Sequence, residues 1–245
     1  MNFPHAPSPQ QRVPAWRYRL RRFLRVKRTQ LDGFTLLAYR EDIPKHVSSL
    51  LIRGDYEYPE RRAVAAVVRP GDRVLEIGSC VGVIALAAAA RAGAGNVMTY
   101  EPNPAAYKIA TENFAANNQP VVAVNRAVGG SDGEIDMQVG SGSWVGASAL
   151  RTLADGRTIK VKVDGIRDVT THFRPTVLIV DAEGMERDIL PNADYTSIRA
   201  VIVEFHPDVL SANELTGLRA RMQSNGLVKS SDLSSEATEV WLRPE

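Results

Sequence analysis

One acid and two glycines follow the first strand-forming run of the chain with a spacing that suits ligand binding. Residues 74–77 are apolar and rich in strand formers, and the chain there reads Glu-x-Gly-x-x-x-Gly, from Glu76 through Gly78 to Gly82. An alanine-rich segment with helical spacing comes next. A strand, a glycine turn and a helix in this order present backbone N–H groups and a positive helix end to a nucleotide-like ligand.

A second acid is placed to bind a sugar. Glu101 follows Gly82 by nineteen residues, at the end of a second expected strand, 96–101. A carboxylate at that place accepts hydrogen bonds from both hydroxyls of a ribose. Glu76 suits a cationic amine, such as that of S-adenosylmethionine, whereas NAD-binding loops usually read G-x-G-x-x-G. The alternative is a glycine turn of an α/β fold with unrelated acids.

Acids and a histidine gather where two later strands are expected to end. Asp181, Glu183 and Glu186 follow the apolar strand 175–180, and His206 follows the strand 200–205. Open α/β sheets bind ligands at the carboxyl ends of their strands. We expect His206 to be the proton acceptor, because an unperturbed pKa of ~6.5 leaves much of the imidazole neutral near pH 7. Asp181 and Glu183 are the alternative bases, particularly if burial raises a carboxylate pKa. Glu186 is expected to face solvent.

The same groups are chemically suitable for a divalent ion, since carboxylates beside a histidine bind such ions. No spacing among Asp181, Glu183, Glu204 and His206 is diagnostic, so the sequence predicts no metal. His206 could also be a strand-end histidine that only caps backbone groups. Cys80 is expected to be a small packing residue of the turn and not a nucleophile.

Two loops are candidates to cover a ligand. Tyr58 and Glu60 lie in the acidic, aromatic segment 53–60, just before an expected helix at 61–68. Trp144 and Ser148 lie in a glycine- and serine-rich segment. Binding residues are often carried by such loops. An exposed loop in the first case, and a hairpin connection in the second, are the alternatives.

Strands and helices alternate from residue 74 onward, which predicts a doubly wound, Rossmann-like and mostly parallel sheet. The last two strands are joined by a short turn and must pair antiparallel. Residues 131–163 break the alternation and predict an inserted β-hairpin. The seven strands expected in the sheet are 74–78, 96–101, 120–124, 175–180, 200–205, 227–231 and 239–242, and the helices are 81–92, 104–117, 185–190 and 213–224.

Composition predicts an ordinary globular protein. The 245 residues are 44% hydrophobic and 24% charged, with a net charge of +2 and one cysteine. No apolar run reaches the ~18 residues that a membrane span needs, so no stable membrane insertion is expected. A single cysteine fits a reducing compartment, and we expect a cytoplasmic location.

The charge is unevenly distributed. Residues 1–30 carry eight Arg or Lys and no acid, so the remainder carries 22 basic against 28 acidic residues, a net charge of −6. A negative main part argues against a nucleic-acid substrate. Residues 16–28 predict a basic amphipathic helix whose apolar side is a docking face and not a membrane anchor. We expect a partly disordered basic extension (1–30), a strand and helix cap over the ligand site (31–69) and the main domain (70–245).

With these motifs in place, the chain resembles the FkbM family of S-adenosylmethionine-dependent methyltransferases, which have the class I methyltransferase fold. The matching segments span about residues 55–207. They read PGD at 70–72, VLEIGSCVG at 74–82, YEPNP at 100–104, NRAVG at 125–129, GAS at 146–148 and DAEGME at 181–186. Two positions depart from the family pattern, which commonly has Asp at Glu76 and Asn at Cys80.

The resemblance implies a cofactor site on matching positions. Gly78, Ser79 and Gly82 would form the cofactor turn beside Glu76, and Glu101 would bind the ribose, within a motif that includes Pro102 and Asn103. Asn125, Ala127 and Val128 would line the adenine, and Asp181 would face the methionine end or the substrate. Because a thiol is a weak donor, Cys80 would lack one polar contact to the cofactor.

The expected function is O-methylation of a hydroxyl on a small molecule, a secondary metabolite or a sugar, with S-adenosyl-L-methionine as cofactor. Carboxyl or N-methylation stays open. Two other classes are a nicotinamide-dependent oxidoreductase, which the glycine spacing and the antiparallel ending disfavour, and a binding module without turnover. A small-molecule acceptor is the expected partner, and a homodimer is left open.

Overall fold

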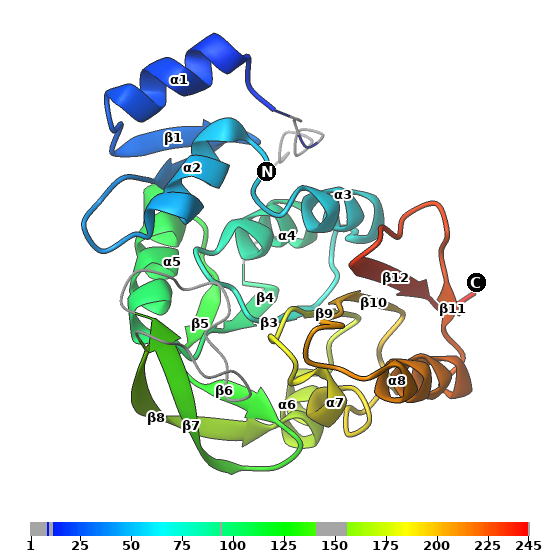
Figure 1. Ribbon diagram of the computed structural model, residues 1–245. Coiled ribbons are helices and arrows are strands. Elements are labelled where there is room, and N and C mark those ends of the chain that lie inside the picture. The colour runs from blue at the N-terminus through cyan, green and yellow to red at the C-terminus, as the bar shows by residue number, and fades with distance from the viewer. Residues whose placement is uncertain (1–8, 10–11, 94, 141–155, 245) are drawn as a thin grey trace.

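The computed structural model describes residues 9, 12–93, 95–140 and 156–244. Its centre is a seven-stranded sheet with the order β11-β12-β10-β9-β3-β4-β5 (Figure 1). The strands are β3 (Val74–Ile77), β4 (Val97–Tyr100), β5 (Val122–Val124), β9 (Val177–Val180), β10 (Ala200–Glu204), β11 (Val228–Lys229) and β12 (Thr238–Leu242).

The direction of the strands confirms the predicted sheet. Strands β5, β4, β3, β9 and β10 are parallel to one another, and β12 runs antiparallel to both β10 and β11. The short connection between β11 and β12 leaves no room for a crossover helix, so they pair antiparallel as expected.

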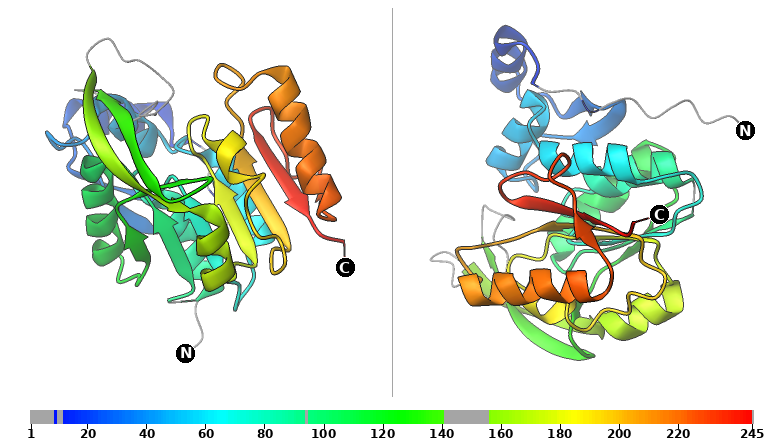
Figure 2. Two further views of the ribbon diagram at one scale, coloured as in Figure 1. Left: turned by 90° about the horizontal axis from the view of Figure 1, so that it is seen from below. Right: turned by 90° about the vertical axis from the view of Figure 1, so that its right-hand side faces the viewer.

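Helices cover both faces of the sheet (Figure 2). One face carries α3 (Tyr58–Val67), α4 (Val83–Ala92) and α5 (Pro104–Ala116), and the other carries α6 (Ile166–Phe173), α7 (Glu186–Ile189) and α8 (Ala212–Ser224). Side chains alternate along each strand, so Val74 packs in the first apolar cluster while Leu75 and Ile77 pack in the second. Both faces are therefore buried, as the continuous apolar strands indicated.

The N-terminal part consists of α1 (Ala15–Phe23), a hairpin of β1 (Arg28–Leu31) and β2 (Phe34–Leu37), and α2 (Lys45–Arg53). The hairpin is fixed to α5, because the amides of Leu37 and Thr35 donate to Asn113 Oδ1 at 2.9 Å and Asn117 Oδ1 at 2.8 Å. Its buried leucines belong to the same apolar cluster as α4.

The predicted hairpin insertion is present. Strands β7 (Gly133–Gly140) and β8 (Gly156–Gly165) pair antiparallel and form a three-stranded sheet with β6 (Ala127–Gly129). Trp144 and Ser148, predicted to cover the ligand, lie outside the described residues.

One helix begins earlier than expected. The segment 53–60 was predicted as a loop before a helix at 61–68, but α3 begins at Tyr58, directly after Glu57, whose φ is +45°. Pro59 occupies the first turn, where a missing N–H removes no hydrogen bond. Tyr58 and Glu60 are therefore helical residues and not parts of a loop. Among the described helices, none is long and apolar enough to cross a membrane.

Candidate functional site

A cavity of about 490 Å³ lies at the carboxyl ends of β3, β4, β9 and β10. This main cavity has the size of a small-molecule site, for which ~300–1,000 Å³ is usual. The predicted cofactor and catalytic residues that line it come from four strand ends and from β6; they are Gly78, Glu101, Pro102, Ala127, Val128, Asp181, Glu183 and His206. Parts of the chain more than a hundred residues apart thus meet where the sequence analysis expected a ligand.

The glycine turn after β3 is held tightly between its two neighbouring strands. A Cβ on Gly78 would lie 1.8 Å from the carbonyl oxygen of Asp181, and the φ of Gly78 is +92°. The amides of Gly78 and Ser79 donate to the carbonyl of Tyr100 at 2.9 and 3.3 Å. These two N–H groups therefore hold the turn against β4 and are not directed at a ligand.

Two backbone amides fix the carboxylate of Glu101, for which ribose binding is predicted. Its Oε2 accepts from the amide of Cys80 at 2.7 Å, and its Oε1 accepts from the amide of Asn103 at 2.8 Å. Burial raises the pKa of Glu101 to about 7, and these two backbone hydrogen bonds oppose the rise. Each carboxylate oxygen keeps a lone pair for a further donor, such as a ribose hydroxyl.

Glu76 has a different place from the one expected. It is not among the described residues that line the main cavity, because strand side chains alternate and that of Ile77 takes the cavity side. The Glu76 carboxylate accepts from the Thr99 hydroxyl and from the amide of Ala85 in the first turn of α4. Burial raises the pKa of Glu76 to about 8. Its position is that of a buried partner of the α4 N-terminus, and the expected contact with an amine is not supported.

Four other residues predicted to bind cofactor are not among the described residues that line the main cavity, and they support its wall from behind. Asn103 caps α5 by accepting from the Ala105 amide at 3.0 Å. Asn125 donates to the carbonyl of Glu101 at 2.7 Å. A Cβ on Gly82 would lie 2.5 Å from a ring carbon of Phe114, so this glycine allows the start of α4 to approach α5 closely. The fourth is Ser79, whose hydroxyl is buried.

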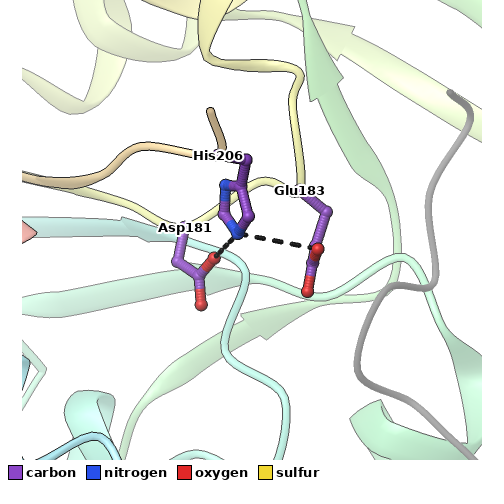
Figure 3. A group of neighbouring side chains, drawn as sticks. All are labelled: Asp181, Glu183 and His206. Atoms are coloured by element: carbon purple, nitrogen blue, oxygen red, sulfur yellow. Dashed lines mark ion pairs between the residues drawn. The ribbon is translucent and has the colours of Figure 1, made fainter. Parts of the chain in front are cut away.

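Three predicted catalytic side chains meet at one end of the main cavity (Figure 3). His206 Nε2 lies 3.6 Å from Asp181 Oδ1 and 3.6 Å from Glu183 Oε2. Glu183 has a φ of +51° and precedes Gly184 at +103°, so the loop after β9 turns sharply at this point. The charges of the two acids and of the imidazole therefore interact directly.

Glu186 corrects two expectations. It does not face solvent but is completely buried, and its Oε1 lies 3.1 Å from His206 Nδ1 and 3.0 Å from the Ala182 amide. Burial alone lowers the pKa of His206, but the hydrogen bond with Glu186 and the surrounding carboxylates raise it to about 9. The imidazole is therefore protonated near pH 7 in this environment, and the neutral base expected from an unperturbed pKa is not favoured.

Of Tyr58 and Glu60, which were predicted to cover the ligand, only Glu60 lines the main cavity among the described residues. Glu60 lines the main cavity, but it is buried in α3 and accepts a hydrogen bond from the Thr238 hydroxyl. Tyr58 is not among the described lining residues; its ring lies 5.4 Å from the Arg61 guanidinium. A residue fixed in a helix in this way belongs to a wall and not to a mobile cover.

Two further acids of the main cavity, Glu57 and Glu204, were given no catalytic or cofactor role from the sequence. Burial raises the pKa of Glu57 well above its usual value, and burial with the charge of Glu60 raises that of Glu204 to about 7. Glu204 was considered only as a possible metal ligand, and Glu57 only as one of the acids in the segment 53–60. The cavity wall thus holds six carboxylates, those of Glu57, Glu60, Glu101, Asp181, Glu183 and Glu204, against His206 and Arg126.

A buried arginine shapes the Glu57 side of the main cavity. Arg61 is fully buried and pairs with Asp32 at 2.6 Å. It also donates to the carbonyls of Tyr56 at 2.8 Å and Gly54 at 2.7 Å. These contacts fasten the segment before α3, which contains Tyr56 and Glu57, to the N-terminal hairpin.

Cys80 lines the main cavity with a φ of +45°. Burial raises the pKa of its thiol well above the usual value, so the thiol is protonated at neutral pH. A protonated thiol is a poor nucleophile, which agrees with the packing role expected for this residue.

One group of residues could hold a metal. Asp181, Glu183 and His206 each offer one ligand atom, and the three atoms lie within 4.8 Å of one another. Two carboxylates and an imidazole suit a divalent ion such as Mn²⁺. The protonated imidazole already supplies a positive charge at this place, so the absence of a metal stays our prediction.

The chain matches the family described as methyltransferase FkbM domain over residues 76–226. A stretch of 81 residues is 37% identical to the ribosomal protein L11 methyltransferase of Bacillus cytotoxicus, covering 32% of this chain and 26% of that protein. The chain thus spans only about a quarter of the length of this curated relative.

Two solved structures are similar in fold. Methyltransferase FkbM from Methylobacillus flagellatus KT has a TM-score of 0.46 and 14% identity, with 81% of this chain and 53% of that chain covered. The ribosomal protein L11 methylase from Lactobacillus delbrueckii subsp. bulgaricus has a TM-score of 0.42 and 14% identity, with 77% of each chain covered.

Proposed function

Since the chain belongs to the FkbM methyltransferase family, we propose that it transfers a methyl group from S-adenosylmethionine to a hydroxyl of a small molecule. A secondary metabolite or a sugar is the proposed acceptor. The observation that carries the proposal is a single acidic cavity that contains both Glu101 and the cluster of Asp181, Glu183 and His206.

The charge of the main cavity favours this cofactor. Six carboxylates line it against one arginine and one histidine. Burial raises the pKa of four of these groups, Glu57, Glu101, Asp181 and Glu204, and a bound cation would favour their ionised form. S-adenosylmethionine carries a sulfonium and an ammonium group, whereas the pyrophosphate of NAD or the phosphates of a nucleic acid would be repelled. The same charge argues against the oxidoreductase alternative.

The residues of the wall also fit the cofactor by type. Glu101 would accept from the ribose hydroxyls, and the apolar side chains of Pro102, Ala127 and Val128 would pack against the adenine. Asp181 Oδ1 is buried and has no hydrogen-bond partner among the described residues. An unpartnered buried oxygen in the cavity wall would accept from a bound donor, such as an ammonium group or an acceptor hydroxyl.

The chemistry required of the protein is orientation and proton transfer. When bound, the cofactor supplies the activated methyl carbon, and the bond from this carbon to sulfur breaks as the bond to the acceptor oxygen forms. We propose that Asp181 or Glu183 accepts the proton that leaves the hydroxyl. Burial and the charge of Glu204 raise the pKa of Asp181 well above its usual value, and the charge of His206, which is held by Glu186, opposes this rise. All three predicted catalytic residues thus retain a role.

Calorimetry and methyl transfer test the proposal together. Glu101→Gln removes an acceptor of the ribose hydroxyls, and we expect S-adenosylmethionine to bind more weakly by about 1–3 kcal/mol. His206→Gln should keep most of this affinity but abolish transfer of labelled methyl to hydroxyl acceptors. Unchanged binding by Glu101→Gln would contradict the ribose assignment, and labelling of amines or carboxylates alone would contradict the hydroxyl acceptor.

We further propose a reducing compartment such as the cytoplasm. The proposal rests on the single cysteine, Cys80, which has no second cysteine to pair with.

A further inference from the structure

Helix α1 is oriented with its apolar side away from the protein. Trp16, Leu20, Phe23 and Leu24 follow one side of the helix at intervals of four, three and one residues. All four are exposed, Phe23 to 84% and Trp16 to 66%. Helices of a globular protein usually bury such a stripe.

The polar side of α1 faces the body instead. Tyr18 and Arg21 are half-buried, and Arg21 Nη1 donates to the Thr29 hydroxyl in β1 at 3.2 Å. Figure 1 shows α1 at the margin of the molecule, beyond β1 and α2 and far from the central sheet. The apolar stripe is therefore exposed because the polar side of the helix is fixed to the protein body. The helix has not lost contact with the protein.

The exposed apolar side chains are concentrated in this one place. Of the large hydrophobic residues that are exposed in the described chain, the four of α1 and its end stand together. The other two, Val122 and Val228, lie singly on strands β5 and β11 at opposite edges of the sheet. Single exposed apolar residues are ordinary, whereas a contiguous group marks an interaction site.

The charge around the stripe is of one sign. Arg17, Arg19, Arg22 and Arg25 are exposed beside it, followed by Lys27 and Arg28. The first acidic residue of the chain is Asp32, which is buried against Arg61. The surface formed by residues 15–28, the N-terminal patch, therefore combines an apolar stripe with arginine flanks.

In place of the docking face without membrane contact that the sequence predicted, we propose that the N-terminal patch binds the surface of an anionic lipid bilayer. Aromatic and leucine side chains on one side of a short helix and arginines on the other are the pattern of a helix that lies in the membrane interface. Anionic headgroups complement the arginine flanks, and the lipid interior takes up the stripe. RNA would use the arginines but would leave Leu20 and Phe23 exposed, and a second copy would bring like charges together.

The proposal explains why the extension is basic and amphipathic although the main cavity is acidic. A helix of nine residues is too short to cross a bilayer, so the binding is peripheral and reversible. It is independent of the proposed methyl transfer, because none of the patch residues lines the main cavity in the described chain.

Vesicle sedimentation of the full chain tests the proposal. We expect binding to vesicles of phosphatidylcholine with roughly 30% phosphatidylglycerol, at least ~10-fold weaker binding to pure phosphatidylcholine, and release by high salt. The triple variant Trp16→Ser, Leu20→Ser, Phe23→Ser should bind anionic vesicles at least ~10-fold more weakly. The control variant Val122→Ser, Val228→Ser changes exposed apolar residues elsewhere and should bind like the wild type.

A second variant separates charge from apolar contact. Arg17→Gln, Arg19→Gln, Arg22→Gln keeps the stripe and should lose the preference for anionic over neutral vesicles. The thermal midpoint of each variant, which changes only exposed residues, should match that of the wild type. Equal binding by the triple serine variant would overturn the proposal. So would binding of RNA without binding of vesicles, or a stripe that serves only to form a dimer in sedimentation velocity.

Discussion

The charge of His206 is set by its neighbours and not by its own chemistry. Its ring lies against the buried Glu186 on one side and against Asp181 and Glu183 on the other, and its pKa is raised to about 9. An imidazolium cannot accept a proton from a hydroxyl. His206 therefore fits the proposed role of acting on the charge of Asp181, whose pKa it lowers against the effect of burial, better than it fits the role of the base.

Glu186→Gln tests this arrangement through pH. Transfer by the wild type should decline as pH rises through about 9, where His206 loses its proton. Glutamine removes one of the charges that raise this pKa, so the alkaline decline should begin roughly one unit lower. The measurement is kcat against pH. Glu134→Gln, on the exposed start of β7, is the matched control, and an unmoved decline in Glu186→Gln would exclude the proposed charge state.

Removal of metal gives a second test of the same residues. If the imidazolium supplies the positive charge between Asp181 and Glu183, dialysis against EDTA should leave the rate of methyl transfer unchanged, and added Mn²⁺ should not raise it. Loss of activity with EDTA, restored by Mn²⁺, would show that the three ligand atoms hold an ion.

At the scale of single residues, the sequence predicted which residues lie at the site better than it predicted where each side chain points. Glu101, Asp181, Glu183 and His206 were predicted for the site, and the structure brings them to one cavity, because the carboxyl ends of the parallel strands that precede them lie at one edge of the sheet. The place of Glu76 depends on which side of β3 faces α4. The burial of Glu186 depends on how α7 packs. Neither is readable from local spacing.

Among the elements, the turn after β3 is the most constrained by its neighbours. Gly78→Ala would put a methyl group 1.8 Å from the backbone of Asp181 in a conformation with positive φ. We expect a loss of at least ~2 kcal/mol in the free energy of unfolding, because backbone cannot move aside cheaply. Binding of S-adenosylmethionine should weaken as well, since Asp181 must shift.

Gly217→Ala is the matched control for this substitution. Gly217 lies in the middle of α8 on its exposed side, where an added Cβ meets no atom within 4 Å. The same change should there raise the free energy of unfolding by about 0.5–1 kcal/mol, through helix propensity alone. Urea unfolding should show a lower free energy of unfolding for Gly78→Ala and a higher one for Gly217→Ala. Equal changes in the two variants would refute the steric reason given for Gly78.

Most elements were predictable because their signals are local. The seven strands and the capped start of α5 follow from apolar runs and from Asn103 before a proline. The start of α3 was missed because acidic and aromatic residues next to a proline are typical of a loop. Glu60 and Arg61 are buried in the structure, and the local sequence does not predict this burial. Likewise, the outward stripe of α1 depends on a contact outside the helix, the hydrogen bond from Arg21 to Thr29 of the hairpin.

Across the whole molecule, the edge of the sheet opposite the main cavity is tied together by one carboxylate. Asp72 lies before β3 and accepts from Thr176 at 2.7 Å, before β9, and from Arg199 Nε at 3.0 Å, before β10. The amide of Arg69, just after α3, donates to it at 2.7 Å. Three segments far apart in the sequence, at residues 69–72, 176 and 199, therefore meet at Asp72.

This carboxylate makes stability depend on pH. Burial alone would raise the pKa of Asp72, but the hydrogen bonds from Arg199, the Arg69 amide and Thr176 lower it below its usual value. The unfolded chain then binds the proton more readily than the folded one. The contribution of Asp72 to the free energy of unfolding is therefore full above its unfolded pKa of ~3.9, and it is lost as the pH falls through its folded pKa. Asp72→Asn should lower the free energy of unfolding at pH 7 by about 1–3 kcal/mol.

Urea unfolding between pH 7 and pH 3 checks the sign. The difference in the free energy of unfolding between wild type and Asp72→Asn should shrink as the pH falls. Acid protonates the carboxylate of Asp72 in the wild type, and the variant lacks this carboxylate at every pH. Asp136→Asn, in an exposed pair with Lys160 on the hairpin, should change stability by less than about 0.5 kcal/mol at every pH. Because Asp72 lies at the opposite edge of the sheet, its variant should bind S-adenosylmethionine as tightly as the wild type. A difference that stays constant with pH would mean that Asp72 acts through packing and not through its charge.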